Sequence, residues 1–172
     1  MSKLIDIADL DVIYLTYDEP KREEFWIKIQ NMVPWAKRVD GVKGSDAAHK
    51  ACADVSDTDR FVLIDGDNIP NPQFFNLSLS LDNTNQNNVF RWRARNHING
   101  LQYGNGGLSC WTKEFVYNMR THEASDGDAK NDVEFVFTLT IGPCMTATQQ
   151  HILTNHLSKH GVQASVKVLR CA

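Results

Sequence analysis

One segment, residues 61–67 with the sequence FVLIDGD, constrains the fold of this chain more than any other. Its first four residues are continuously apolar, which is typical of a strand covered on both faces in a parallel sheet. Asp65 and Asp67 follow at the carboxyl end, where open α/β sheets place their ligands. Two carboxylates separated by one glycine can reach a single hard cation that keeps other oxygen ligands. The segment therefore predicts a buried strand with a metal site at its end.

Two strand and helix pairs precede this segment. Strands are predicted over residues 12–16 and 36–39, and the apolar spacing predicts helices from Pro20 to Asn31 and from Asp46 to Val55. Strands that alternate with helices predict an α/β fold, Rossmann-like, with a central and mostly parallel sheet flanked by helices. The 172 residues suit one domain with its own core.

The second half of the chain is less regular. Pro70-Asn71-Pro72 predicts a turn, residues 73–81 are predicted as a helix, and the Asn-rich residues 82–88 as a surface loop. Beyond them, the patterns predict a strand over 89–98, a Gly-rich turn and short strand over 103–110, helices over 113–120, 131–140 and 145–160, and a strand over 162–168.

Composition narrows the classes of function. The formal net charge of −3 argues against nucleic-acid binding through bulk charge, because phosphate contacts need a basic face. No stretch approaches the roughly 20 apolar residues of a membrane span, and acids interrupt the start of the chain where a signal peptide would be apolar. We therefore expect a soluble, cytoplasmic protein. The 4 cysteines form no Cys-x-x-Cys pair and are expected to be reduced thiols.

The acidic turn does not fit a calcium loop of the EF-hand type. Such a loop needs an oxygen ligand at its fifth position and glycine at its sixth, and counting from Asp65 these are Ile69 and Pro70. A second acidic loop, Asp126-Gly127-Asp128, has Lys130 at its fifth position. A cation that also binds a diphosphate fits the turn better.

Residues 12–70 resemble the nucleotide-binding half of GT-A glycosyltransferases. Tyr17-Asp18-Glu19 resembles the Tyr-Asn-Glu of their first strand, residues 44–50 resemble their Gly-x-x-x-Ala-x-Asn region, and Asp65-Gly66-Asp67 falls on their DXD motif. Within that fold the chain is most similar to very short glycosyltransferase-like proteins of phages and bacteria. The resemblance implies a single GT-A domain over residues 1–172, with a nucleotide-binding half at 1–70 and an acceptor half at 71–172.

The resemblance also implies a binding site. Asp65 and Asp67 would hold Mn²⁺ or Mg²⁺ against the diphosphate of a nucleotide-sugar donor, and Asn105-Gly106-Gly107-Leu108 resembles the Gly-rich loop that approaches donor and acceptor. The residues implied to contact the donor are Thr16, Tyr17, Asp18, Lys43, His49, Gly106 and Gly107.

A catalytic base is implied in the second half. Residues 131–135, NDVEF, resemble the family's acidic xED motif, which makes Asp132 the candidate base of an inverting transfer. Asp126 and Asp128 are rival bases on a Gly-containing loop. A late histidine usually completes the family's metal site, and no choice is made among His151, His156 and His160.

The predicted function is transfer of a hexose from a nucleotide diphosphate sugar, of the UDP-glucose kind, to the hydroxyl of a glycan or other acceptor. A non-catalytic module that binds a nucleotide sugar or carbohydrate is one alternative. A nucleotidyltransferase is another, although no Gly-x-x-x-x-Gly-Lys loop is present. Arg91, Arg93 and Arg95 alternate, so they form either a basic strand face for phosphate, glycan or single-stranded nucleic acid, or a solvated face.

Overall fold

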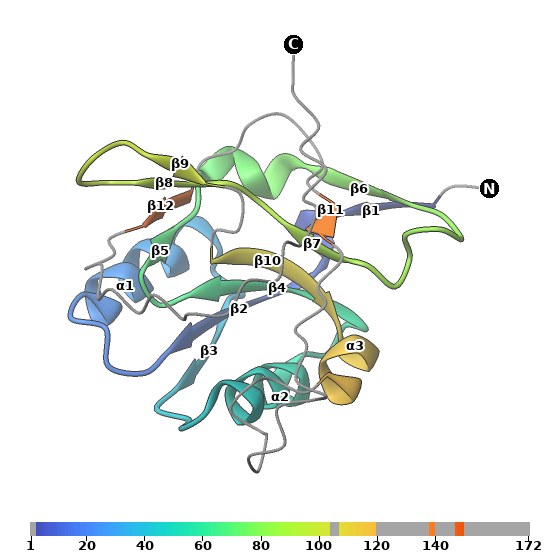
Figure 1. Ribbon diagram of the computed structural model, residues 1–172, viewed down its shortest axis with the longest axis horizontal. Helices are drawn as coiled ribbons and strands as arrows, with labels where there is room; N and C mark the ends of the chain where they lie inside the picture. The colour runs from blue at the N-terminus through green and yellow to red at the C-terminus, as the bar shows by residue number, and fades with distance from the viewer. Residues whose placement is uncertain (1–2, 104–106, 120–137, 140–146, 150–172) are drawn as a thin grey trace, which may run out of the picture.

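The computed structural model describes residues 3–103, 107–119, 138–139 and 147–149, and its central sheet is mixed (Figure 1). The order across this six-stranded sheet is β11-β7-β10-β4-β2-β3. Strands β3, β2 and β4 are parallel, whereas β10 runs antiparallel to both β4 and β7, and β11 is parallel to β7. The strands are β2 (Asp11–Thr16), β3 (Lys37–Asp40), β4 (Arg60–Asp65), β7 (Val89–Arg91), β10 (Leu108–Thr112) and β11 (Thr138–Leu139).

The predicted fold class, a Rossmann-like GT-A domain with a mostly parallel sheet, is wrong. The structure is a small mixed α/β fold, and its described residues contain three α-helices: α1 (Arg22–Met32), α2 (Ser45–Val55) and α3 (Lys113–Asn118). The parallel arrangement ends at β4, because β10 enters beside it from the opposite end. An antiparallel neighbour needs no crossover helix, and a continuously apolar strand does not encode the direction of its neighbour.

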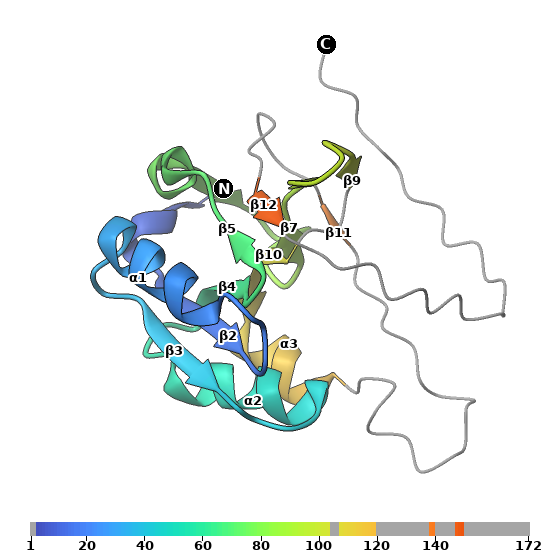
Figure 2. The same ribbon diagram turned by 90° about the vertical axis from the view of Figure 1, so that its left-hand side faces the viewer.

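The first half follows the sequence pattern closely. The predicted strands and helices before residue 67 are present with bounds shifted by a few residues. Val62 and Ile64 of β4 pack into the core on the α1 side, whereas Phe61 and Leu63 pack into the core on the side of α2 and α3. Figure 2 shows α1 and α2 on opposite sides of β2 and β4. Burial on both faces explains why residues 61–64 carry no polar side chain.

The helix predicted over residues 73–81 is wrong. A 3₁₀-helix, η2 (Pro72–Asn76), is followed by β6 (Ser78–Leu81), which pairs antiparallel with β1 (Lys3–Asp6). Another 3₁₀-helix, η1 (Ile7–Asp9), joins β1 to β2. Exposed and buried residues alternate along β6. This period of two is characteristic of a strand and not of a helix.

A third sheet has the order β5-β12-β8-β9. The strand predicted over residues 89–98 is split, because the chain leaves the central sheet after β7 and its continuation pairs in this third sheet. Residues 138–139 and 147–149 are strands where helices were predicted, and the remainder of those segments and residues 162–168 lie outside the described residues. The strands are β5 (Asn68–Ile69), β8 (Ala94–Asn96), β9 (Gln102–Tyr103) and β12 (Ala147–Gln149).

No helix in the described part of the chain is sufficiently long and apolar to span a membrane.

Candidate metal and diphosphate site

One edge of the central sheet gathers the ends of several strands. Because β2, β3, β4 and β7 all run in the same direction, their last residues, Thr16, Asp40, Asp65 and Arg91, lie along this edge. Gly107 lies there too, since it immediately precedes the antiparallel strand β10. The carboxyl ends of strands are where open α/β sheets bind ligands. The acidic turn after β4 is therefore well placed for binding.

Backbone contacts on two sides fix this turn. The backbone N–H of Asp65 donates to the carbonyl of Gly107 over 2.8 Å. The hydroxyl of Tyr14, which is fully buried in β2, donates to the carbonyl of Gly66 over 2.7 Å. The turn is thus attached both to β2 and to the segment that enters β10, so the sheet holds the backbone that carries its carboxylates.

Two glycines allow polar side chains to approach each other closely. A Cβ atom at Gly66 would lie 2.5 Å from the carboxyl carbon of Glu19, and one at Gly107 would lie 2.5 Å from Asp65 Oδ2 and overlap Asn68 Nδ2. No other residue type fits either position without a shift of these groups. The glycines therefore bring Glu19 against the acidic turn and Asn68 against Asp65.

The electrostatic environment of Asp65 is unfavourable for a lone carboxylate. Burial raises the pKa of Asp65 to about 7, the negative charge of Asp67 raises it as well, Arg91 lowers it, and Glu19 raises it. Three acids thus face one guanidinium group. A bound cation would favour the ionised form of Asp65, because an opposite charge nearby stabilises a carboxylate.

The residues of the turn fit a hard divalent cation. Carboxylate and amide oxygens are the donors that Mg²⁺ and Mn²⁺ prefer, and Asp65, Asp67 and Asn68 supply them from four consecutive positions. Across residues 3–103 and 107–119, however, no three His, Cys, Asp or Glu side chains form a complete metal-binding group. A cation held here would therefore keep positions for water or for oxygens of a substrate. The late histidines lie outside the described residues.

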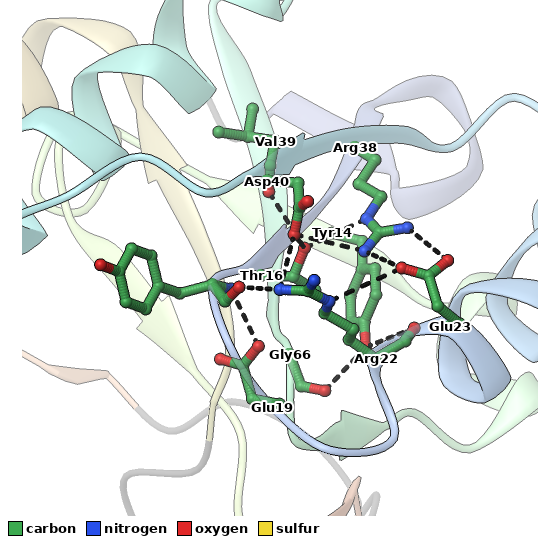
Figure 3. A network of polar contacts seen from close by, with 10 residues as sticks. Tyr14, Thr16, Glu19, Arg22, Glu23, Arg38, Val39, Asp40 and Gly66 are labelled. Carbon is green, nitrogen blue, oxygen red and sulfur yellow. Dashed lines mark hydrogen bonds and ion pairs between the residues drawn. The ribbon is translucent and has the colours of Figure 1, made fainter.

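A second polar network holds the ends of β2 and β3 together (Figure 3). The buried hydroxyl of Thr16 donates to Asp40 Oδ1 over 2.6 Å and accepts from Arg38 Nε over 3.1 Å. Arg38 also binds both carboxylate oxygens of Glu23 on α1, over 2.9 and 2.7 Å. Arg22 donates to the carbonyl of Tyr17. The hydroxyl of Thr16 is thus already engaged within the protein.

The other residues predicted to contact a donor lie in different surroundings. Tyr17 is 48% exposed, and Asp18 and Lys43 are exposed in the loops after β2 and β3. The ring of His49 on α2 packs edge-on against Trp111 with centroids 5.4 Å apart. Gly107 contacts Asp65 directly, as described above. Gly106, Asp126, Asp128 and Asp132 lie outside the described residues.

Three residues of the site were not among the predicted site residues. Glu19 lies against Gly66, Asn68 hydrogen-bonds Asp67, and Arg91 acts electrostatically on Asp65 while its guanidinium lies 5.2 Å from the ring centroid of Trp111. For Asn68 the signal was its position next to the acidic turn. For Arg91 the signal was its alternation with Arg93 and Arg95, which suggests a phosphate-binding face. That pattern does not place Arg91 near Asp65, because its position depends on the antiparallel pairing of β7 with β10.

Comparisons of the chain with models of protein families, with curated proteins and with solved structures found no match.

Proposed function

We propose that this protein binds a nucleoside diphosphate sugar through a divalent cation at Asp65 and Asp67 and transfers the sugar to an acceptor hydroxyl. The observation that carries the proposal is the environment of Asp65, a partly buried carboxylate whose neighbours Asp67 and Glu19 are also acidic. A protein that needed this turn only for folding would place hydrogen-bond donors around the acid, since these lower the cost of burying a charge. In this proposal the bound divalent cation supplies the positive charge that the residues around Asp65 provide only in part.

A diphosphate is the substrate group that suits such a site. Two carboxylates occupy only part of the coordination sphere of Mg²⁺ or Mn²⁺, and these cations commonly complete it with substrate phosphates. The bound cation would neutralise charge on the diphosphate as it leaves the sugar. Asp65 and Asp67 would bind and orient that cation, while Tyr14 and Gly107 keep the turn fixed.

Residues around the edge support binding of the phosphates of the donor. Lys43 is exposed in the loop that precedes α2, and the N-cap residue of that 11-residue helix is Gly44, which has no side chain to cap it. Backbone N–H groups at a helix N-terminus and a lysine are both suited to phosphate oxygens. The proposal that the transferred group is a hexose, from a UDP-glucose-like donor, rests on the resemblance of residues 12–70 to glycosyltransferases.

The catalytic base belongs to the same proposal. Asp132 would take the proton from the acceptor hydroxyl as that oxygen attacks the anomeric carbon, and the diphosphate would leave from the opposite face. This assignment rests on the likeness of residues 131–135 to an acidic motif of inverting enzymes. General-base catalysis typically contributes about 10²- to 10⁴-fold to a rate, so loss of Asp132 should remove turnover and spare donor binding.

The test uses a panel of nucleotide sugars with Mn²⁺. We expect one donor, with UDP-glucose the first candidate, to raise the melting temperature only when Mn²⁺ is present and to release nucleoside diphosphate. Asp132→Asn should bind this donor normally and release no diphosphate, whereas the matched variant Asp126→Asn should remain active. Binding without release in the wild type would identify a non-catalytic module. Release of pyrophosphate would identify a nucleotidyltransferase. No Mn²⁺-dependent binding of any donor would refute the proposal.

A further inference from the structure

Asn68 follows the acidic turn directly, and its side chain is 0% exposed. Its amide nitrogen, Nδ2, donates to Asp67 Oδ1 over 2.6 Å. Its amide oxygen, Oδ1, is buried as well and accepts no hydrogen bond from the described residues. One half of this amide is therefore satisfied by the acidic turn, and the other half is not.

The Asn68 amide lies beside both acids of the turn. A Cβ atom on Gly107 would overlap Asn68 Nδ2 and lie 2.5 Å from Asp65 Oδ2, so both atoms lie against the same Cα. The hydrogen bond to Asp67 places the second carboxylate next to the same amide. Asp65, Asp67 and Asn68 thus converge on one small space bounded by Gly107.

The nature of the neighbours indicates what satisfies Asn68 Oδ1. Buried polar atoms without partners are rare in native proteins, and ordered water or an ion commonly accounts for them. A water molecule would satisfy the amide oxygen but would add no positive charge beside the carboxylates of Asp65 and Asp67. A divalent cation satisfies all three groups, because amide carbonyls are ordinary ligands of hard cations alongside carboxylates.

We propose that Asn68 Oδ1 is the third protein ligand of the cation held by Asp65 and Asp67. This inference rests on the proposed function. In the cation-free protein the amide N–H binds Asp67 in place of a cation. When the cation binds, a half-turn of the amide about its Cβ–Cγ bond directs Oδ1 toward it. That rotation breaks the hydrogen bond to Asp67, moves Nδ2 to the place that Oδ1 occupied, and requires no movement of the backbone.

A role as a ligand must be separated from a role in positioning Asp67. Asn68→Cys does so, because a thiolate prefers soft cations whereas carboxylate and amide oxygens prefer hard ones. In this variant we expect Cd²⁺ to displace bound Mn²⁺ at a ratio of Cd²⁺ to Mn²⁺ at least about tenfold lower than in the wild type. The electron paramagnetic resonance signal of the released Mn²⁺ measures this displacement. A thiolate-to-Cd²⁺ charge-transfer absorption should arise at the same time. Ser80→Cys, an exposed residue of β6, controls for the added thiol.

Two further variants test the oxygen itself. Asn68→Asp keeps an oxygen ligand and should retain Mn²⁺ binding, whereas Asn68→Leu has a similar size without a ligand atom and should weaken binding about 10- to 100-fold. Far-ultraviolet circular dichroism checks that each variant is folded. If Asn68→Leu binds Mn²⁺ like the wild type, or if Asn68→Cys shows the Cd²⁺ preference of the wild type, Asn68 is not a ligand. A wild-type protein that binds no Mn²⁺, with or without UDP, would instead refute the proposed function.

Discussion

Two aspartates of neighbouring strands, Asp11 and Asp65, lie at opposite ends of the central sheet and in opposite electrostatic environments. Asp11, at the start of β2, accepts hydrogen bonds from Lys37 Nζ over 3.0 Å, from Thr58 N over 3.3 Å and from Asp57 N. Burial acts to raise the pKa of Asp11, but these donors outweigh it and hold the pKa below its usual range. Asp65, at the end of β4, has a pKa raised to about 7 by burial and by acidic neighbours.

The difference separates an acid whose charge is matched within the fold from an acid whose charge is matched only in part, as the proposed cation site requires. The charge of Asp11 is matched by a lysine and by backbone donors within the protein, which closes the loop before β4 against β2. The charge of Asp65 is matched only in part, by Arg91. The pKa of Asp65 is raised, whereas that of Asp11 in the same sheet is lowered. Acids with a strongly perturbed pKa at the edge of a sheet where ligands bind are candidates for function, which favours a functional role for Asp65 over a structural one. Changes at each acid should therefore have different consequences.

The largest effect is expected from Asp65→Asn. This variant should bind Mn²⁺ and nucleotide sugar at least about 100-fold more weakly, since even outer-shell partners of metal ligands contribute 10- to 100-fold. Its melting temperature without metal should be unchanged or higher, because a partly buried negative charge beside other acids is gone. Isothermal titration calorimetry measures the affinity. Unchanged Mn²⁺ affinity would place the cation elsewhere, and Asp11→Asn is the matched control that should bind normally.

Asp11→Asn should show the converse behaviour. Replacing the carboxylate leaves Lys37 without one of its acceptors and turns an amide toward backbone donors, so we expect a loss of about 2 kcal/mol in the free energy of unfolding. Urea denaturation measures this loss. The affinity of the folded variant for Mn²⁺ should equal that of the wild type. A variant as stable as the wild type would show that the hydrogen bonds of Asp11 contribute little to folding.

The surroundings of Asp65 also show which features of the fold and of the site the sequence predicts. The pattern in residues 61–67 predicts β4 and the acidic turn, because burial on both faces demands apolar residues and a turn tolerates Asp-Gly-Asp. It does not predict that β10 is antiparallel to β4, since side-chain polarity reports burial and not strand direction. The alternation of Arg91 with Arg93 and Arg95 therefore could not place Arg91 beside Asp65. The position of Asn68 next to the acidic turn likewise did not show that its amide is buried, because that burial depends on where Gly107 lies.

The pH dependence of stability should have opposite signs at the two acids. Asp65 in the cation-free protein binds its proton more tightly than in the unfolded chain, so its contribution is full below pH 3.8 and is lost as the pH rises toward about 7. Asp11 has a lowered pKa, so its contribution is present above pH 3.8 and is lost as the pH falls through its folded pKa.

Thermal unfolding from pH 5 to pH 8 isolates the contribution of Asp65, because the carboxylate of Asp11 is ionised throughout this range. The wild type should lose stability relative to Asp65→Asn as the pH rises, and Mn²⁺ should restore it most strongly at pH 8, where it does not compete with a proton. Parallel curves for the wild type and Asp65→Asn would mean that burial and the acidic neighbours do not raise the pKa of Asp65.

The smallest effect is expected from Tyr14→Phe, which tests whether the turn must be fixed as well as charged. The substitution removes the hydroxyl that donates to the carbonyl of Gly66 over 2.7 Å and leaves the ring packing intact. We expect a loss of about 1 kcal/mol in stability, the typical contribution of one hydrogen bond, and only a few-fold weaker Mn²⁺ binding. Because the carboxylates remain, affinity should fall far less than in Asp65→Asn. An equal fall in both variants would show that the geometry of the turn, and not its charge, limits binding at this edge.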